Sequence, residues 1–159
     1  MVKIRIINVG TNKEGYIREG IEEYTKRLSK VAQVEFVSVP ETKLPSSPSD
    51  SEIYSALLKD ADLISKNILK GSFVFAMCIE GKQLSSIEFS EMISSGMLSF
   101  SSFTFIIGGS FGLSDRIKSI ADYKLSMSKM TLPHSLAKLV LCEQIYRAFS
   151  ILGGSKYNK

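Results

Sequence analysis

The stretch LSMSKMTLPHSLAKLVLCEQIYRAF, at Leu125–Phe149, carries the features that decide the fold. It begins as a short apolar segment and continues into a proline-led helix with the only histidine of the chain, His134. A second stretch, FTFIIGGSFGL at Phe103–Leu113, runs from an apolar strand into a glycine turn. Strand, glycine turn and helix start in this order are typical of an α/β domain that binds a ligand at its strand ends.

Strands and helices alternate along the rest of the chain. Apolar patterns predict five strands, at Lys3–Val9, Gln33–Val39, Ser72–Ile79, Ser102–Ile107 and Tyr123–Ser128. Helical spacing predicts five helices, at Lys13–Val31, Asp50–Leu69, Ile87–Leu98, Ser114–Ala121 and Pro133–Leu152. Ser49 or Asp50 could cap the second helix, and Ser85 or Ser86 the third. Glu80–Lys82 is predicted to be a turn. The alternation predicts one α/β domain over residues 1–159, with a mostly parallel sheet and helices on both of its faces.

Composition favours a soluble cytoplasmic protein. Apolar residues make up 44% and charged residues 23%, both ordinary for a globular chain. The longest apolar run, Phe73–Ile79, has seven residues and is too short to cross a membrane. The start MVKIRIINVG has no secretory core. Cys78 and Cys142 lie in apolar segments, away from any zinc-like cluster, so we expect core thiols and no metal.

The basic residues gather toward the end of the chain. Residues 1–115 carry 12 basic and 14 acidic side chains, whereas residues 116–159 carry 8 basic and 2 acidic ones. A basic end on a near-neutral body favours a polyanionic partner such as nucleic acid. A surface excess that only increases solubility is the alternative.

Three apolar strands end in distinctive segments, AMCIEGK, IIGGSFG and LSMSKMT. No phosphate-binding GxxxxGK[ST] motif is present, and no acid stands where a nicotinamide dinucleotide site requires one. The segments therefore predict a pocket of backbone and apolar side chains that suits a nucleoside-like ligand. The glycines Gly108, Gly109 and Gly112 could instead form a tight turn without any ligand.

The motifs FIIGGSFGL and LSMSKMTLPHSLAKLVLCEQIYRAFSILGGSKYNK resemble those of the SPOUT-class RNA methyltransferases of the RlmH type. The resemblance extends over essentially the whole chain and includes INVG at the start, EYTKRL in the first helix and EGKQLSS after the third strand. It implies an S-adenosylmethionine-dependent enzyme that methylates N3 of a pseudouridine in large-subunit ribosomal RNA. It also implies a C-terminal trefoil knot and a homodimer.

The resemblance also implies site residues. The cofactor-binding positions would be Met77, Gly108, Met127, Ser128, Lys129, Met130, Thr131 and Leu132. The methionine side chains could equally be ordinary core, with the site role carried by their backbone. His134 would lie beside the methyl donor and orient the target base or accept its proton. The alternative for His134 is a polar residue at a helix start.

The end of the chain carries the remaining predicted site residues. The apolar run LVLC, at Leu139–Cys142, suggests a helix that is buried or lies in the dimer interface. Arg147 could contact RNA phosphate or simply pair with Glu143 one helical turn earlier. The family resemblance implies that the tail helps to complete the active site, so Tyr157 and Lys159 are candidates for catalysis and for contacts with RNA. Asn158, between them, is predicted to contact RNA.

Three positions depart from the family pattern. Asn158 stands where the family usually has histidine, Cys78 where an acid is common, and Thr11 where lysine is usual. If the tail histidine removes a proton, Asn158 cannot replace it, because an amide is not a base. Two alternatives therefore stay open: a catalytically altered RNA-binding relative, and a nucleotide-binding α/β protein that transfers no methyl group.

Overall fold

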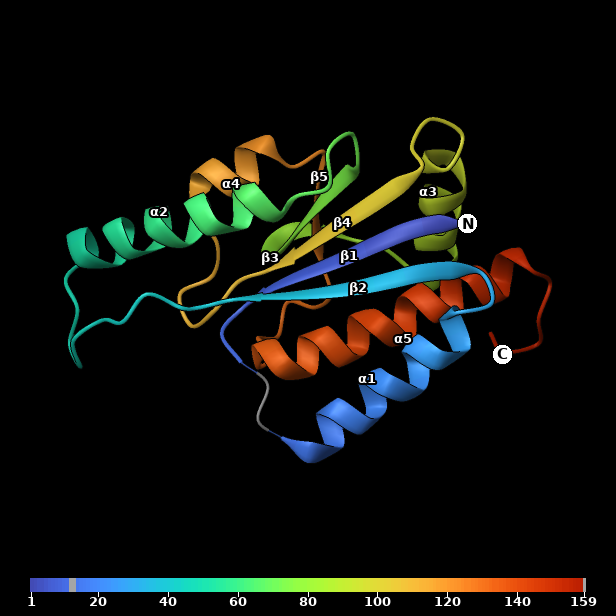
Figure 1. The fold of residues 1–159 in the computed structure, drawn as a ribbon, viewed down its shortest axis with the longest axis horizontal. Helices are drawn as coiled ribbons and strands as arrows, with labels where there is room; N and C mark the ends of the chain where they lie inside the picture. The colour runs from blue at the N-terminus through green and yellow to red at the C-terminus, as the bar shows by residue number, and fades with distance from the viewer. Residues whose placement is uncertain (12–13, 159) are drawn as a thin grey trace.

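The computed structural model describes residues 1–11 and 14–158, and in these residues strands and helices alternate as the sequence predicts (Figure 1). The strands are β1 (Val2–Val9), β2 (Ala32–Val39), β3 (Phe73–Gln83), β4 (Ser102–Ile107) and β5 (Tyr123–Ser126). The helices are α1 (Gly15–Leu28), α2 (Asp50–Asn67), α3 (Ser86–Gly96), α4 (Asp115–Ile120) and α5 (His134–Leu152). None of the described helices is long and apolar enough to cross a membrane.

The five strands form one parallel sheet in the order β2-β1-β4-β3-β5. Helices α2 and α4 cover one face and α1, α3 and α5 the other (Figure 1). Successive residues of a strand point to opposite faces, so β1 serves both layers. Ile6 packs beneath α1 and α5, whereas Ile7 packs beneath α2 and α4. The predicted α/β fold is confirmed, and the trefoil knot stays a prediction.

Serine side chains begin three of the helices, as the sequence predicts. Ser49 and Ser85 each accept a hydrogen bond from a backbone amide three residues later, and a glutamate at that position bonds back to the serine amide. Ser114 accepts from the amide of Ile117 at the start of α4. These bonds satisfy backbone amides that have no partner in the first turn of a helix, and they fix the residues at which the three helices begin.

The third strand is longer than predicted, because the expected turn at Glu80–Lys82 continues the strand. After an irregularity between Met77 and Lys82, residues 82–83 pair with Leu125 and Ser126 of β5. Gly81 permits this pairing, since a Cβ there would lie 2.8 Å from the backbone of Lys124 and Leu125. The segment Cys78–Gly81 bulges out of the sheet at the edge of the cavity described below.

The apolar run Leu139–Cys142 is accounted for within one chain. Leu141 and Cys142 are each 1% exposed and belong to the core between the sheet and α5. Leu139 packs on α1, where a Cβ on Gly20 would lie 2.7 Å from its Cδ1. Of the two alternatives for this run, burial within the chain is therefore confirmed for Leu141 and Cys142. Dimerisation itself stays a prediction.

Candidate active site

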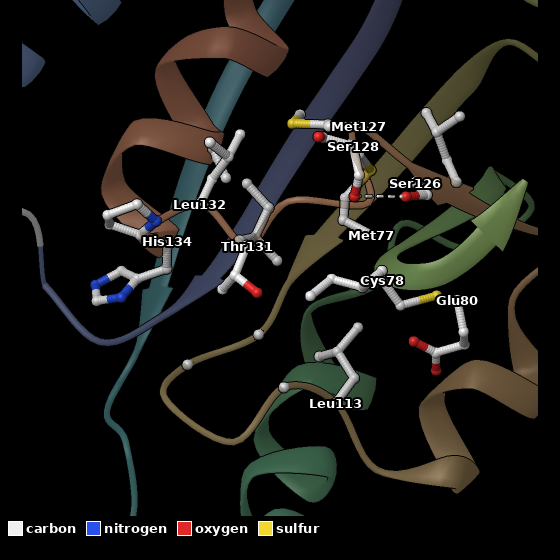
Figure 2. Close-up of a pocket in the computed structure, with 18 of the residues that line it drawn as sticks. Met77, Cys78, Glu80, Leu113, Ser126, Met127, Ser128, Thr131, Leu132 and His134 are labelled. Atoms are coloured by element: carbon white, nitrogen blue, oxygen red, sulfur yellow. Dashed lines mark hydrogen bonds between the residues drawn. The ribbon is translucent and has the colours of Figure 1, made fainter. Parts of the chain in front are cut away.

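A cavity of about 760 Å³ opens at the carboxyl ends of β3, β4 and β5, and the start of α5 closes it (Figure 2). Its size falls in the range of pockets for small organic ligands. The wall is mainly backbone and apolar side chains, among them Met77, Leu113 and Leu132. The three strand ends that the sequence singles out thus line one cavity.

The glycine turn after β4 forms one wall. A Cβ on Gly108 would lie 2.5 Å from the backbone carbonyl atoms of Gly112, and Gly112 has a φ of +76°. The amide of Gly112 donates to the carbonyl of Gly109 at 3.1 Å. Gly108 and Gly112 are therefore required by the turn itself, and a larger residue at Gly108 would disrupt the turn before it filled the cavity.

The connection between β5 and α5 forms the opposite wall. Ser126 Oγ donates to the carbonyl of Ser128 at 3.1 Å, and Ser128 Oγ accepts from the amide of Met130 at 2.9 Å. These bonds hold the segment in a compact turn. Seven of the eight predicted cofactor positions line the cavity, namely Met77, Gly108, Met127, Ser128, Met130, Thr131 and Leu132. Lys129 is exposed and does not line it.

A charged edge borders the cavity at the bulge of β3. Glu80 forms an ion pair with Lys118 of α4, and this contact lowers the pKa of the Glu80 carboxyl. The half-buried thiol of Cys78 lies beside it (Figure 2). Burial, together with the charge of Glu80, raises the pKa of Cys78, so this thiol is not an activated nucleophile.

His134 is the first residue of α5 and lines the cavity from the side nearest β1 (Figure 2). Pro133, before it, makes no side-chain cap. A Cβ on Gly10 would lie 3.6 Å from His134 Nε2 and 3.8 Å from Glu41 Oε2. Glu41 Oε1 also accepts a hydrogen bond of 2.8 Å from the amide of Ser110, a residue of the glycine turn. An imidazole and a carboxylate therefore flank the end of β1.

Sequence reasoning missed several residues of this region. Glu41 lies 69 residues from Ser110, and only the fold brings the two together. Lys118 and Ala137 also line the cavity, although no motif marks them. The sequence indicates Glu80 only weakly, through its position directly after the strand predicted at residues 72–79.

The remaining predicted site residues lie at the other end of α5. Arg147 donates from Nε to Glu143 at 3.0 Å, and from Nη1 to Asn158 Oδ1 at 3.2 Å. The hydrogen bonds to Glu143 raise the pKa of Arg147. Tyr157 OH donates to Glu143 at 3.2 Å, and burial raises the pKa of Tyr157. One chain therefore does not bring these residues to His134, and Lys159 lies outside the described residues.

Comparison with known proteins places this architecture in a family. The family model described as a predicted SPOUT methyltransferase matches residues 2–158. Proteins named ribosomal RNA large subunit methyltransferase H are similar over 99% of this chain and their own full length, with 48% identity in Streptococcus suis and 46% in Leuconostoc citreum.

Two solved structures share the fold. A probable methylase family protein from Haemophilus influenzae has a TM-score of 0.55 at 17% identity, covering 98% of this chain and 70% of that one. A methylase family protein from Neisseria gonorrhoeae has a TM-score of 0.51 at 15% identity, covering 90% and 81%. With the family model and the full-length relatives, these findings lead to one assignment: the chain belongs to the SPOUT methyltransferase family.

Proposed function

We propose that this protein transfers a methyl group from S-adenosylmethionine to N3 of a pseudouridine in large-subunit ribosomal RNA, in the cytoplasm. The observation that carries the proposal is the cavity in which three strand ends, the glycine turn and His134 meet. The names of the full-length relatives support the ribosomal substrate. The excess of basic residues after residue 115 supports a polyanionic partner.

The chemistry of the cavity wall fits S-adenosylmethionine. Apolar side chains such as Leu113 and Leu132 suit the faces of an adenine ring, while backbone groups near Met77, Gly108 and Met127 can bond its edge. The charged edge at Glu80 offers a carboxylate that can accept from hydroxyl groups. When bound, S-adenosylmethionine supplies an electrophilic methyl group on a sulfonium centre.

The protein must align the base and take up its N3 proton. His134 lines the cavity and is the nearest candidate, because the imidazole can accept a proton at a ring nitrogen. The new bond from N3 to the methyl carbon would replace the methyl–sulfur bond of the cofactor, which would leave as a neutral thioether, and the N3 proton would pass to His134 or to solvent. Asn158 positions RNA without taking up this proton, since its amide is not basic.

We further propose that the protein acts as a homodimer in which the tail of one copy completes the cavity of the other. In one chain Tyr157 and Arg147 lie at the far end of α5 from His134. In a two-fold dimer the start of α5 in one subunit can lie beside the end of α5 in the other, because the two-fold axis makes every such contact twice. This arrangement would allow Tyr157, Asn158 and Lys159 to contact RNA near the methyl donor.

A titration followed by a transfer assay tests the proposal. S-adenosylmethionine should bind, and NAD and ATP should not. Label from methyl-labelled S-adenosylmethionine should then enter the large-subunit RNA of ribosomes that lack this modification. A catalytically altered relative would bind RNA and cofactor without transfer. Preference for NAD or ATP would instead identify a nucleotide-binding protein of another kind.

A further inference from the structure

Lys138 is a buried cation to which the proposed reaction assigns no role. Only 5% of the residue is exposed, and its Nζ donates to Asn8 Oδ1 at 2.8 Å. The ammonium also lies 4.8 Å from the centre of the Phe36 ring, a cation–π contact. Among the ion pairs of residues 1–11 and 14–158, none involves Lys138.

A charged Lys138 in this buried position lowers the stability of the folded state. Burial lowers the pKa of Lys138, because removal from water disfavours the ammonium. Lys138 also lies only one turn from the start of α5, where the positive end of the helix dipole repels a cation. An apolar side chain of similar length would avoid both effects. The position therefore calls for a reason other than stability.

The amide of Asn8 connects Lys138 to the end of β1. Asn8 is fully buried, and its Oδ1 accepts from Lys138 and also from Ser38 Oγ at 3.2 Å. Its Nδ2 donates to the carbonyl of Gly10 at 2.8 Å. An ammonium can only donate, so it holds Oδ1 toward α5 and leaves Nδ2 directed at Gly10.

Gly10 is also the point at which the chain approaches His134. It has a φ of +89°, and a Cβ on it would lie 3.6 Å from His134 Nε2. His134 and Lys138 are one helical turn apart, on the same face of α5. Two side chains of one helix face thus approach the same segment: His134 lies beside the position that a Gly10 side chain would occupy, and Lys138 is connected to Gly10 through Asn8.

We propose that Lys138 is a positioning residue, which through Asn8 holds Gly10 in place and thereby fixes the ring of His134 at the cavity. Its effect on rate rests on the proposed function, whereas its effect on the ring does not. A lysine retained only for packing would contribute to stability and leave the ring unchanged. The two roles therefore predict different outcomes when the charge is removed.

Three substitutions test separately the hydrogen bonds that Asn8 makes with Lys138, Gly10 and Ser38. Lys138→Met removes the charge and the donor at similar length, and leaves Asn8 Oδ1 its bond from Ser38. Asn8→Asp keeps the acceptor for Lys138 but places an oxygen against the carbonyl of Gly10. Ser38→Ala is the matched control, because it removes the other donor to Asn8 and leaves the path from Lys138 to Gly10 intact.

The ring of the only histidine gives a readout that needs no RNA. We expect the His134 ring resonances to move in Lys138→Met and Asn8→Asp, and to stay in Ser38→Ala. We expect kcat to fall by about tenfold or more in the first two variants, with Kd for S-adenosylmethionine within about twofold of wild type. The free energy of unfolding of Lys138→Met should equal or exceed that of wild type.

Unchanged ring resonances in both Lys138→Met and Asn8→Asp would overturn the proposal. Equal effects in the Ser38→Ala control would also overturn it, because the network would then act only as core packing. If Lys138→Met fails to fold, the lysine is structural and Asn8→Asp decides whether the ring still depends on Gly10. If the ring moves while the wild type transfers no methyl group, the positioning stands and the proposed function fails.

Discussion

His134 and Tyr157 lie at opposite ends of helix α5. His134 is the first residue of the helix, whereas the ring of Tyr157 packs 4.9 Å from that of Tyr146. Tyr146 follows His134 by roughly 18 Å along the helix axis, at a rise of about 1.5 Å per residue. The chain folds back after α5 and is held there by Arg147. A site that uses both residues must therefore draw on two copies of the chain.

Mixed dimers test this arrangement. Protein with His134→Ala and protein that lacks residues 157–159 should each be nearly inactive alone. Mixed and allowed to exchange subunits, they should recover roughly a quarter of wild-type activity, because about half of the dimers contain one intact composite site. No recovery, with exchange confirmed by mass spectrometry, would mean that the tail acts on its own chain or not at all.

Arg147→Ala should release the tail. Its guanidinium bonds Glu143, the carbonyl of Tyr157 and Asn158, so we expect faster protease cleavage at Lys156 and a methylation rate close to that of the truncated protein. Arg27→Ala is a suitable control, because it removes an arginine that lies over the nearby rings of Tyr24 and Tyr146 but bonds Glu23 of its own helix.

The salt dependence of RNA binding separates two roles of Arg147. In protein that already lacks residues 157–159, a guanidinium occupied by Glu143 should leave the slope of log K against log salt unchanged when Arg147 is replaced by alanine. A decrease of about one unit in that slope would instead show a lost phosphate contact.

Ala137→Leu should block cofactor binding without loss of fold. Ala137 lines the cavity from the first turns of α5, and leucine is a good helix former that would fill the space beside it. We expect Kd for S-adenosylmethionine to rise by about tenfold or more, while Ala137→Ser stays near wild type. Unchanged affinity in the leucine variant, with an unchanged melting temperature, would place the cofactor elsewhere.

Cys78 should report occupancy of the cavity. Its half-buried thiol lines the cavity, whereas Cys142 is 1% exposed in the core. One thiol per chain should react with a soluble thiol reagent, slowly at neutral pH because burial raises the pKa of Cys78. S-adenosylmethionine should slow this reaction, and adenine should do so less. A Cys78→Ser variant that keeps one reactive thiol would show that Cys142 is the accessible one.

Alkaline pH should destabilise the fold through Cys142. Burial raises its pKa from 9.0 to about 12. The thiol therefore contributes stability that is fully present below pH 9 and is lost as the pH rises toward 12. Lys138, whose pKa is lowered, acts in the opposite direction below its ordinary value of 10.5. Urea unfolding of Lys138→Met at several pH values gives a free energy of unfolding to which this lysine no longer contributes. In the double variant that also carries Cys142→Ala, this free energy should decline less above pH 9. An equal decline with alanine would assign it to other groups.

Much of the fold could be predicted from local signals. Serine caps, glycine turns and apolar runs mark where elements begin and end, so Ser49, Ser85 and Ser102–Ile107 stand where the sequence predicts. The cavity also follows from local signals, because parallel strands present their carboxyl ends at one edge of a sheet. These features depend on neighbours in the chain, which a sequence displays directly.

The remaining features depend on contacts between distant segments. The strand-like pairing of Lys82 arises from register with β5, and the packing of Leu139 arises from the closeness of Gly20. The contact between Lys138 and Asn8 spans 130 residues. A lysine on a helix is usually exposed, so nothing in its sequence surroundings predicts a buried ammonium.

Mapping of the transferred methyl group identifies the base and the atom on which the protein acts. The wild-type protein is incubated with methyl-labelled S-adenosylmethionine and ribosomes that lack the modification, and the RNA is digested and analysed by mass spectrometry. We expect one labelled nucleoside, a pseudouridine of the large-subunit RNA that carries the methyl group on N3. Label on another base, on another atom of the ring, or on no RNA, with the protein folded and the cofactor bound, would contradict it.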